Sequence, residues 1–178
     1  PCFNEEENIV PICHAIMEEM ETNLPAYDYE LIFIDNHSTD NTKNLIRTLC
    51  QQYKKVKAIF NAKNFHSNSG VYGLMQTTGD CTINIASDFQ CPPDMIHKFV
   101  HEWEQGYKVV CGVKTKSKEN PLMYAIRTLY YKLIKKMSTV EQIEHFTGFA
   151  LYDKSFIEII KTIQDPYPYL RGFVAEYA

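Results

Sequence analysis

The chain has 178 residues, enough for one domain with a single hydrophobic core and too few for a comfortable division into two. Its net charge of −4 gives no basic surface for nucleic acid, and its six cysteines form no C-x-x-C pair that would indicate a zinc or redox site. Because no apolar run reaches the roughly 18 to 20 residues that span a bilayer, we expect the chain as given to be soluble.

Apolar residues alternate between helical periodicity and short strand-like runs, which is typical of a parallel sheet flanked by helices. The first half predicts helices over residues 6–21, 42–53 and from after 65 to about 78, and strands over residues 29–34 and 56–60. The second half predicts strands over residues 81–86 and 107–113 and helices over residues 94–105 and 121–137. Pro92 and Pro93 suit the first turn of a helix, because proline there needs no amide partner. The predicted fold class is α/β with a mostly parallel central sheet.

The most informative segment is the apolar run 31–34, which ends at Asp35 and Asn36 before a helix begins. The carboxyl end of a strand and the amino end of the next helix form a polar crevice where open α/β sheets bind ligands. Two other segments accompany it. Residues 1–8 (PCFNEEEN) lead into the first helix, and the apolar run that starts at Ile83 ends at Ser87 and Asp88.

These three segments, in this order and spacing, resemble the nucleotide-sugar-binding half of a family 2 glycosyltransferase, whose members have a GT-A type fold. Residues 168–176 (PYLRGFVAE) are similar to the end of polyprenyl-phosphate glycosyltransferases, including relatives of dolichol-phosphate mannose synthase. The resemblance covers essentially the whole chain and implies one catalytic domain over residues 1–178. It also implies a longer protein, in which a hydrophobic strand precedes Pro1 and transmembrane helices follow Ala178. The whole protein would then act at the cytoplasmic face of a membrane, and homo-oligomerisation is left open.

The resemblance further implies which residues bind the nucleotide sugar. Asp35 and Asn36 would hold the base and ribose, while the loop near Glu6 would close the pocket. The full nucleotide-binding set that it implies is Phe3, Asn4, Glu6, Asp35, Asn36, Asn64, His66, Ser87 and Asp88. Two of these positions depart from the family, which more often has a second aspartate at Asn36 and a glycine at His66. Glycine is also replaced at His37.

The same residues allow structural interpretations that the sequence leaves open. Asp35 and Asn36 would form only a turn, with Ser38 or Thr39 capping the next helix. Asn4 would cap the first helix, whose opening turn is acidic, and this role is compatible with nucleotide binding. His66 would be a loop histidine in water.

Relatives of this fold commonly hold Mg²⁺ or Mn²⁺ through an Asp-x-Asp pair, because a hard cation binds carboxylate oxygen and offsets the charge of the leaving diphosphate. Here Ala86 stands at the first aspartate position and Cys91 where a further carboxylate can occur. Asp88 is therefore the predicted metal ligand and catalytic residue, with substrate phosphates and water completing the coordination. The alternative is an ordinary acidic loop.

Gly148 stands where relatives carry an aspartate that is a candidate base for the acceptor, and Glu144 and His145 are the nearest substitutes. A polyprenyl phosphate is already ionised at neutral pH, so positioning and charge neutralisation could supply most of the rate. Arg127 and Arg171 are predicted on the acceptor and membrane side. Two alternatives stay open: a solvated helix face that carries Arg127, and packing of the terminal segment with Arg171 against the domain. Asp153 is predicted to cap the helix that follows it.

The function implied is transfer of a sugar from a nucleoside-diphosphate sugar to a polyprenyl phosphate. Two alternatives stay open. Transfer to a saccharide would need a general base, so the missing carboxylate at Gly148 argues against it. A silent nucleotide-binding scaffold is indicated by Ala86, Cys91 and Gly148 together.

Overall fold

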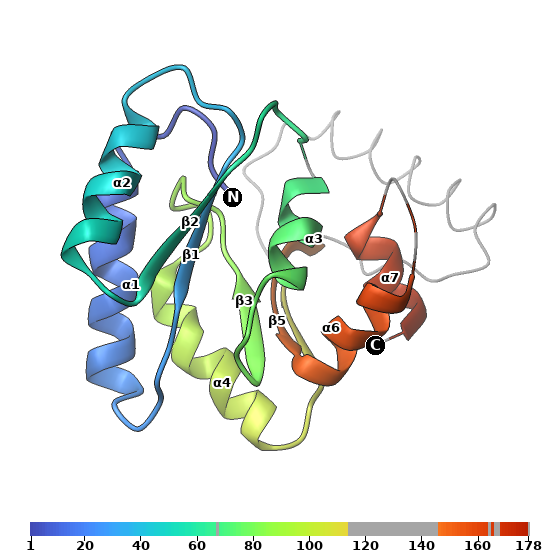
Figure 1. Cartoon of the computed structure of the whole chain (residues 1–178). Coiled ribbons are helices and arrows are strands. Elements are labelled where there is room, and N and C mark those ends of the chain that lie inside the picture. Colours follow the sequence, from blue (N-terminus) through green and yellow to red (C-terminus); the bar gives the residue numbers. More distant parts are fainter. Residues whose placement is uncertain (67, 114–145, 164, 166–167, 178) are drawn as a thin grey trace, which may run out of the picture.

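The computed structural model describes residues 1–66, 68–113, 146–163, 165 and 168–177. Its helices are α1 (Ile9–Asn23), α2 (Thr42–Gln52), α3 (Asn68–Met75), α4 (Ile96–Glu104), α6 (Lys154–Thr162) and α7 (Leu170–Tyr177), with a 3-10 turn over Pro93–Met95 before α4. Its strands are β1 (Leu31–Asp35), β2 (Val56–Phe60), β3 (Cys81–Asn84), β4 (Val109–Val113) and β5 (Phe146–Asp153). Figure 1 shows the strands in the middle of the molecule and the helices around them.

The predicted elements that fall within the described residues are present and differ from the structure mainly at their ends. β2 begins and ends at the predicted residues, whereas α1 begins at Ile9 because a turn precedes it, in which the N–H of Asn8 donates to the carbonyl of Glu5. β5 is an additional strand that the sequence did not predict. The helix predicted over residues 121–137, with Arg127, and the base candidates Glu144 and His145 lie outside the described residues.

The described strands form two hydrogen-bonded groups. β1 and β2 pair in parallel, and Cys2 adds a parallel bridge to Asp35 at the other edge of β1. β5 lies between β3 and β4 and runs antiparallel to both. The α/β class with parallel pairing is confirmed, and β5 adds an antiparallel member to the sheet.

Helices cover both faces of the strands, and β5 contributes to the core on each side. Phe149 and Leu151 pack in one apolar cluster with residues of α1, α2 and α4. Ala150 and Tyr152 point the other way and pack in a second cluster with residues of α3, α6 and α7. Because both faces are covered, the ends of the strands are the part of the sheet that remains accessible to a ligand.

Among the described residues, no helix combines the length and the apolar character needed to cross a bilayer. All six cysteines are free thiols.

Candidate functional site

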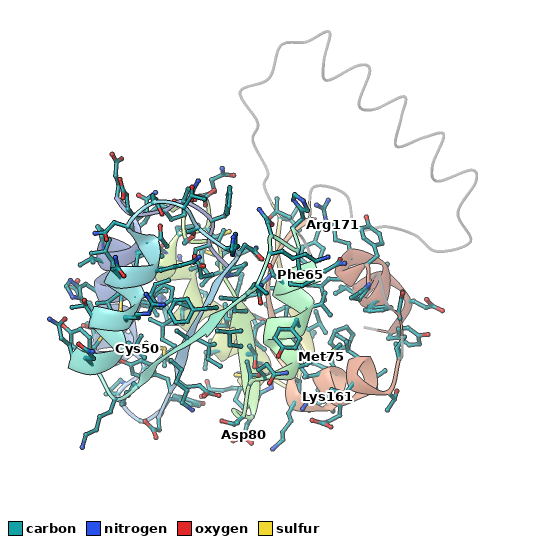
Figure 2. The ribbon with its side chains drawn as sticks, turned by 45° about the horizontal axis from the view of Figure 1, so that its top comes forward. Cys50, Phe65, Met75, Asp80, Lys161 and Arg171 are labelled. Carbon is teal, nitrogen blue, oxygen red and sulfur yellow. The ribbon has the colours of Figure 1, made fainter. Side chains whose placement is uncertain are left out.

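The polar residues that follow β1, β2 and β3 converge at one end of the strands. The N–H of Asn36, just after β1, donates to the carbonyl of Cys2 at 2.9 Å, and Ser87 Oγ, after β3, donates to the carbonyl of Pro1 at 3.2 Å. Figure 2 places Phe65, in the loop after β2, well above Asp80, which lies just before β3 at the bottom of the view. The first residues of the chain therefore lie between the carboxyl ends of β1 and β3.

Asn4 ties the first loop to the loop after β1. Its N–H donates to Ser38 Oγ at 2.9 Å, and its side-chain Oδ1 accepts from the N–H of Thr39 at 2.8 Å. These partners are in the other loop, so the interpretation of Asn4 as a cap of the first helix is wrong. Asn8 is the residue before α1, and its side chain makes no capping bond. Ser38 and Thr39 likewise do not cap α2, which follows Asn41.

The acidic residues next to Asn4 extend this connection. The N–H of Glu5 donates to Thr42 Oγ1 at 2.8 Å, and Glu6 Oε2 accepts from the N–H of Asn41 at 2.8 Å. Asp40 Oδ2 accepts in turn from the N–H of Glu6 at 3.2 Å. Burial of Asp40 works against its charge, but the hydrogen bonds from Thr42 and Glu6 outweigh it and lower its pKa. Glu6 therefore links the two loops through hydrogen bonds.

Cys2 lies beside the hydrogen bonds that link these two loops, and it is 4 % exposed. Its Sγ contacts the carbonyl of Ile34 at 3.5 Å, and burial, together with nearby carboxylates, raises the pKa of the thiol to about 12. The sulfur therefore stays protonated at neutral pH and is unsuited to nucleophilic chemistry.

Asp35 is completely buried at the end of β1 and closes its own turn. Both carboxylate oxygens accept from the N–H of Ser38, at 3.3 and 3.2 Å, and Lys43 Nζ lies 3.9 Å from Oδ2. The turn interpretation of Asp35 therefore describes its contacts in this structure.

Asn36 connects three elements through its amide. Its Nδ2 donates to Ser69 Oγ at 2.8 Å, in the first turn of α3, and its Oδ1 accepts from Asn61 Nδ2 at 3.0 Å, just after β2. Ser69 Oγ donates onward to the carbonyl of His66 at 2.9 Å. The sequence reasoning missed Asn61 and Ser69. Asn61 could have been found by the same rule that selected Asn36, because it is the first polar residue after a strand.

The loop after β2 is held by its own side chains. Asn64 Oδ1 accepts from the N–H of His66 at 2.8 Å, and the imidazole of His66 is exposed. His66 and His37 have φ angles of 51° and 66°, in the left-handed region that favours glycine. Both occupy positions where the resemblance expects glycine. Their left-handed backbone conformation explains why glycine suits these positions.

Ser87 and Asp88 follow β3 with different surroundings. Ser87 is 7 % exposed, and its hydroxyl donates to the carbonyl of Pro1. Asp88 is half-buried, and its Oδ1 accepts from the N–H of Gln90 at 3.1 Å. In the part of the chain that the structure describes, His, Cys, Asp and Glu side chains form no group of three or more suited to a metal ion.

Three exposed phenylalanines surround the strand tips: Phe3, Phe65 and Phe89, at 44, 42 and 41 % exposure. The tips therefore combine polar groups with aromatic faces, which suits a ligand that carries both a flat ring and charged oxygens.

Gly148, at the position of the expected base, lies within β5 with φ of 96°. Its carbonyl accepts from Asn84 Nδ2 at 3.0 Å. An aspartate would rarely adopt this backbone conformation. The backbone at position 148 therefore suits the glycine that is present and disfavours the aspartate that relatives carry.

Asp153 caps α6 as predicted, accepting from the N–H of Ser155 at 2.9 Å. The same carboxylate accepts from Trp103 Nε1 at 2.7 Å and Lys108 Nζ at 3.1 Å. Burial works against its charge, but these hydrogen bonds prevail and hold its pKa far below the usual range. Asp153 is thus a structural residue that joins α4, β4 and α6.

Arg171 lies on α7 with its side chain exposed, and Tyr169 beside it is 50 % exposed. Val174 and Phe173 of the same helix pack against the second apolar cluster. The segment therefore packs on the domain through one side and presents Arg171 on another.

Comparison with known proteins supports this reading of the sequence. The family model described as glycosyl transferase family 2 matches residues 1–160. A bactoprenol glucosyl transferase of Shigella phage SfX is 30% identical over 98% of this chain and 57% of its own length. A prophage bactoprenol glucosyl transferase homolog of Escherichia coli (strain K12) is 29% identical over 98% of this chain and 57% of its own length. The chain thus spans little more than half the length of these relatives.

A solved structure has a similar fold. The crystal structure of S. aureus TarS 1-349 superposes with a TM-score of 0.60 at 14% identity, over 98% of this chain and 52% of that one. At this identity the likeness shows the fold alone, which is of the GT-A type. With the match over residues 1–160 it leads to one conclusion: the chain belongs to glycosyl transferase family 2.

Proposed function

We propose that this chain is the sugar-transferring part of an enzyme that moves a sugar from a nucleoside-diphosphate sugar to a polyprenyl phosphate at the cytoplasmic face of a membrane. The observation that carries the proposal is the similarity, over 98% of the chain, to a bactoprenol glucosyl transferase. Bactoprenol is a polyprenyl alcohol. The converging strand tips support the proposal, because open α/β sheets bind ligands there.

In this proposal the donor lies across the tips. The exposed ring of Phe3 offers a face for the nucleobase, and the turn at Asp35 holds the nucleoside. Asn4, Glu6 and Asn36 act mainly by fixing the loops, since their polar groups bond to other loops. Asn64, His66 and Ser87 border the same opening.

Asp88 fits Mg²⁺ or Mn²⁺ when substrate supplies the remaining oxygens. One of its carboxylate oxygens accepts from Gln90, and its half-buried position leaves room for approach from the tips. Mg²⁺ commonly keeps several waters and binds one or two carboxylates together with phosphates. When bound, the ion would offset charge on the leaving diphosphate. Asp88 would hold the ion beside the donor.

The acceptor step would need no deprotonation. An oxygen of the lipid phosphate, already negatively charged, attacks the anomeric carbon, and the bond from that carbon to the donor diphosphate breaks as the nucleoside diphosphate leaves. The glycine backbone of Gly148 agrees with such an acceptor, because no carboxylate base is required there. Arg171, exposed on α7, would attract the lipid phosphate.

The proposal is tested on the full-length protein by thermal-shift measurement with UDP- and GDP-sugars, with and without Mn²⁺. A donor at a hundredfold excess over its Kd should stabilise the fold by about 2.7 kcal/mol. Asp88→Asn should abolish the part of the shift that needs Mn²⁺. Asp94→Asn, an exposed residue at the start of the next helix, is the matched control and should leave it unchanged.

Transfer itself is followed with labelled sugar and either a short polyprenyl phosphate or a saccharide as acceptor. Labelled lipid that depends on Asp88 supports the proposal. Label in the saccharide alone would mean that the acceptor is a saccharide. A shift with a donor but no transfer to either acceptor would indicate a silent nucleotide-binding scaffold, and the absence of a shift with every donor would overturn the proposal.

A further inference from the structure

Two histidines lie at the tips of β1 and β2 in backbone conformations that cost free energy. His37 follows β1 and His66 lies in the loop after β2, and both side chains are exposed. Their φ angles are 66° and 51°, in the left-handed region that residues other than glycine sparsely populate. Backbone strain of this kind gathers at ligand sites, so the two positions point to a ligand.

Contacts within the chain do not offset the strain at these histidines. In the part of the chain that the structure describes, no hydrogen bond or ion pair involves either imidazole. Asn4 has a similar φ angle of 53°, but its side chain accepts from the N–H of Thr39 at 2.8 Å. The strain at Asn4 therefore accompanies a bond between loops, whereas the ring nitrogens of His37 and His66 are available to a molecule from outside.

A buried serine holds the loops of the two histidines together. Ser69, 1 % exposed in the first turn of α3, accepts from Asn36 Nδ2 at 2.8 Å and donates to the carbonyl of His66 at 2.9 Å. Asn36 directly precedes His37. β1 and β2 are parallel neighbours, so their ends lie about 5 Å apart. His37 and His66 therefore border the same part of the tips.

Asp88 lies at the opposite side of the tips. The bridge between Cys2 and Asp35 places the start of the chain next to β1, on the side away from β2. Ser87, in the loop after β3, donates to the carbonyl of Pro1. The order across the tips is thus the loop after β2, the loop after β1, the first residues of the chain, and the loop after β3. The histidines belong to the first two loops and Asp88 to the last.

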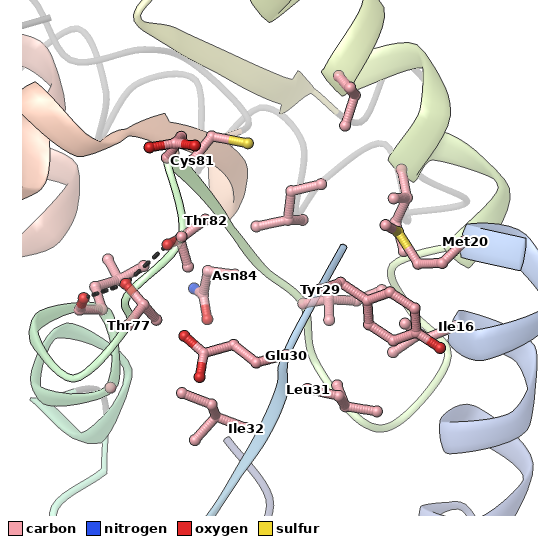
Figure 3. Close-up of a pocket in the computed structure, with 18 of the residues that line it drawn as sticks. Ile16, Met20, Tyr29, Glu30, Leu31, Ile32, Thr77, Cys81, Thr82 and Asn84 are labelled. Carbon is pink, nitrogen blue, oxygen red and sulfur yellow. Dashed lines mark hydrogen bonds between the residues drawn. The ribbon is translucent and has the colours of Figure 1, made fainter. Parts of the chain in front are cut away.

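The cavity between β1 and β3 is a poor site for the donor. It has a volume of about 290 Å³, and Figure 3 shows Glu30 among its mainly apolar lining residues. The charged residues that line it within the described chain are Asp28, Glu30 and Asp80, all acidic, so they offer a diphosphate no opposite charge. Neither His66 nor Asp88 lines it. The donor therefore fits the tips better than the cavity.

We propose that His37 and His66 bind the nucleobase of the donor and thereby determine which base is accepted. This inference rests on the proposed function, in which Asp88 holds the ion beside the diphosphate. A nucleoside diphosphate is elongated, with the base at one end and the diphosphate at the other. A diphosphate near Asp88 therefore directs the base toward the loops after β1 and β2.

Imidazole side chains suit the edge of a nucleobase. A neutral imidazole has one N–H donor and one nitrogen acceptor. The rings of His37 and His66 can together pair with a base whose edge carries both a carbonyl and an N–H, as uracil and guanine do. The exposed ring of Phe3 is available for the face of the same base. Glycine at either position would leave the base without one of these bonds.

Isothermal titration calorimetry of the full-length protein with UDP, GDP and pyrophosphate, each with Mn²⁺, separates the two ends of the donor. His37→Gly and His66→Gly should each weaken binding of the preferred nucleotide by about three- to tenfold, which corresponds to one hydrogen bond. The ratio of the UDP and GDP affinities should move toward one in the double variant. Binding of pyrophosphate, which has no base, should change by less than about twofold.

Two kinds of control show whether the imidazoles themselves are responsible. Asparagine tolerates the left-handed conformation and keeps an amide donor and acceptor, so His37→Asn and His66→Asn should bind the nucleotide more tightly than the glycine variants. His101→Gly should bind all three probes as the wild type does. His101 is exposed on α4, near Trp103, which bonds to Asp153 beside the beginning of β3 and thus at the other end of the sheet.

Each contrary result has a distinct meaning. A double glycine variant that binds UDP and GDP within about twofold of the wild type would overturn the proposal and leave the proposed function in place. Equal weakening of nucleotide and pyrophosphate would also overturn it. If pyrophosphate alone does not bind measurably, asparagine variants as weak as the glycine variants would overturn it. A wild-type protein that binds none of the three probes would contradict the proposed function as well.

Discussion

At the scale of single residues, two histidines occupy backbone conformations that suit glycine. His37 and His66 have φ angles of 66° and 51°, and a non-glycine residue there costs roughly 1 to 2 kcal/mol. Replacing either by glycine should therefore raise the free energy of unfolding, by up to about 1 kcal/mol after the extra chain entropy of glycine is subtracted.

The matched control is His101→Gly in α4, where the backbone is helical and glycine should cost about 1 kcal/mol. Urea denaturation of the three variants gives the comparison. Equal losses at His37, His66 and His101 would show that the two loop histidines make contacts worth more than the strain.

Asn36 illustrates why an amide and a carboxylate are not interchangeable at this position. Ser69 Oγ accepts from the amide of Asn36 and donates to the carbonyl of His66, so its hydroxyl proton is already used. In Asn36→Asp the new carboxylate would need that proton, and the bond to His66 would be lost. We expect the variant to lose about 1 to 3 kcal/mol of stability.

The control for this change is Asn44→Asp on the exposed side of α2, which should alter stability by less than about 0.5 kcal/mol. Donor binding, measured by the same thermal shift as for Asp88, should weaken in Asn36→Asp because the loop that carries His66 loses an anchor. Unchanged stability would mean that the carboxylate finds other donors.

At the scale of elements, α3 approaches β1 at Gly73. A Cβ built there would lie 1.9 Å from Ile34 Cδ1 and 3.3 Å from Cγ1. Gly73→Ala should therefore destabilise the protein by about 1 to 3 kcal/mol through overpacking. Ile34→Val removes Cδ1 and should recover much of the loss in the double variant, so that the two changes are strongly non-additive.

Thermal or urea denaturation of the two single variants and the double variant measures this coupling. Simple additivity would mean that α3 shifts as a whole to accept the methyl group.

Short, strongly apolar elements were predictable and long-range pairing was not. β2 is bounded by Tyr53–Lys55 and Asn61, polar at both ends, so its limits can be read from the chain. β5 contains Thr147 and Gly148, and its side chains are almost all buried, so no alternation marks it as a strand. It exists because β3 and β4 offer it edges from distant parts of the sequence.

The candidate site shows the same division. The ends of β1 at Asp35 and of β3 at Asn84 were predictable to within one or two residues, since a strand that stops at polar residues is a local signal. The hydrogen bonds from Asn4 and Glu6 to the loop after β1 join residues about 35 positions apart. No local sequence pattern indicates which residues are the partners. For this reason the sequence left a helix cap open as an alternative role for Asn4, and Asn4 does not form that cap.

At the scale of the whole molecule, several carboxylates respond to pH together. Glu30, Asp40 and Asp153 are partly or wholly buried, which opposes their charge, but hydrogen bonds to Thr78, Thr42 and Trp103, among others, outweigh this and lower each pKa. A carboxyl group whose pKa is lowered in the folded state stabilises that state at any pH above its pKa in the unfolded chain, which is about 4. This stabilisation is lost as the pH falls below that value.

Stability should therefore be nearly constant from pH 7 to about 5 and fall steadily below about pH 4. Urea midpoints at pH 6, 4 and 3 provide the measurement. Asp153→Asn should be less stable at pH 6 and should show a shallower fall. A midpoint that stays the same from pH 6 to pH 3 would contradict the assignment.

The position of β5 has a consequence for how the protein is made. Leu31 pairs with Val56, so the first two strands can associate soon after Phe60 leaves the ribosome. Ile83 and Val110 both pair with Leu151, so the pairing of β3 and β4 must wait until β5, at least 60 residues after β3, has been synthesised. During translation β3 and β4 are exposed without their common neighbour, and it is this interval in which the nascent chain most needs protection from aggregation.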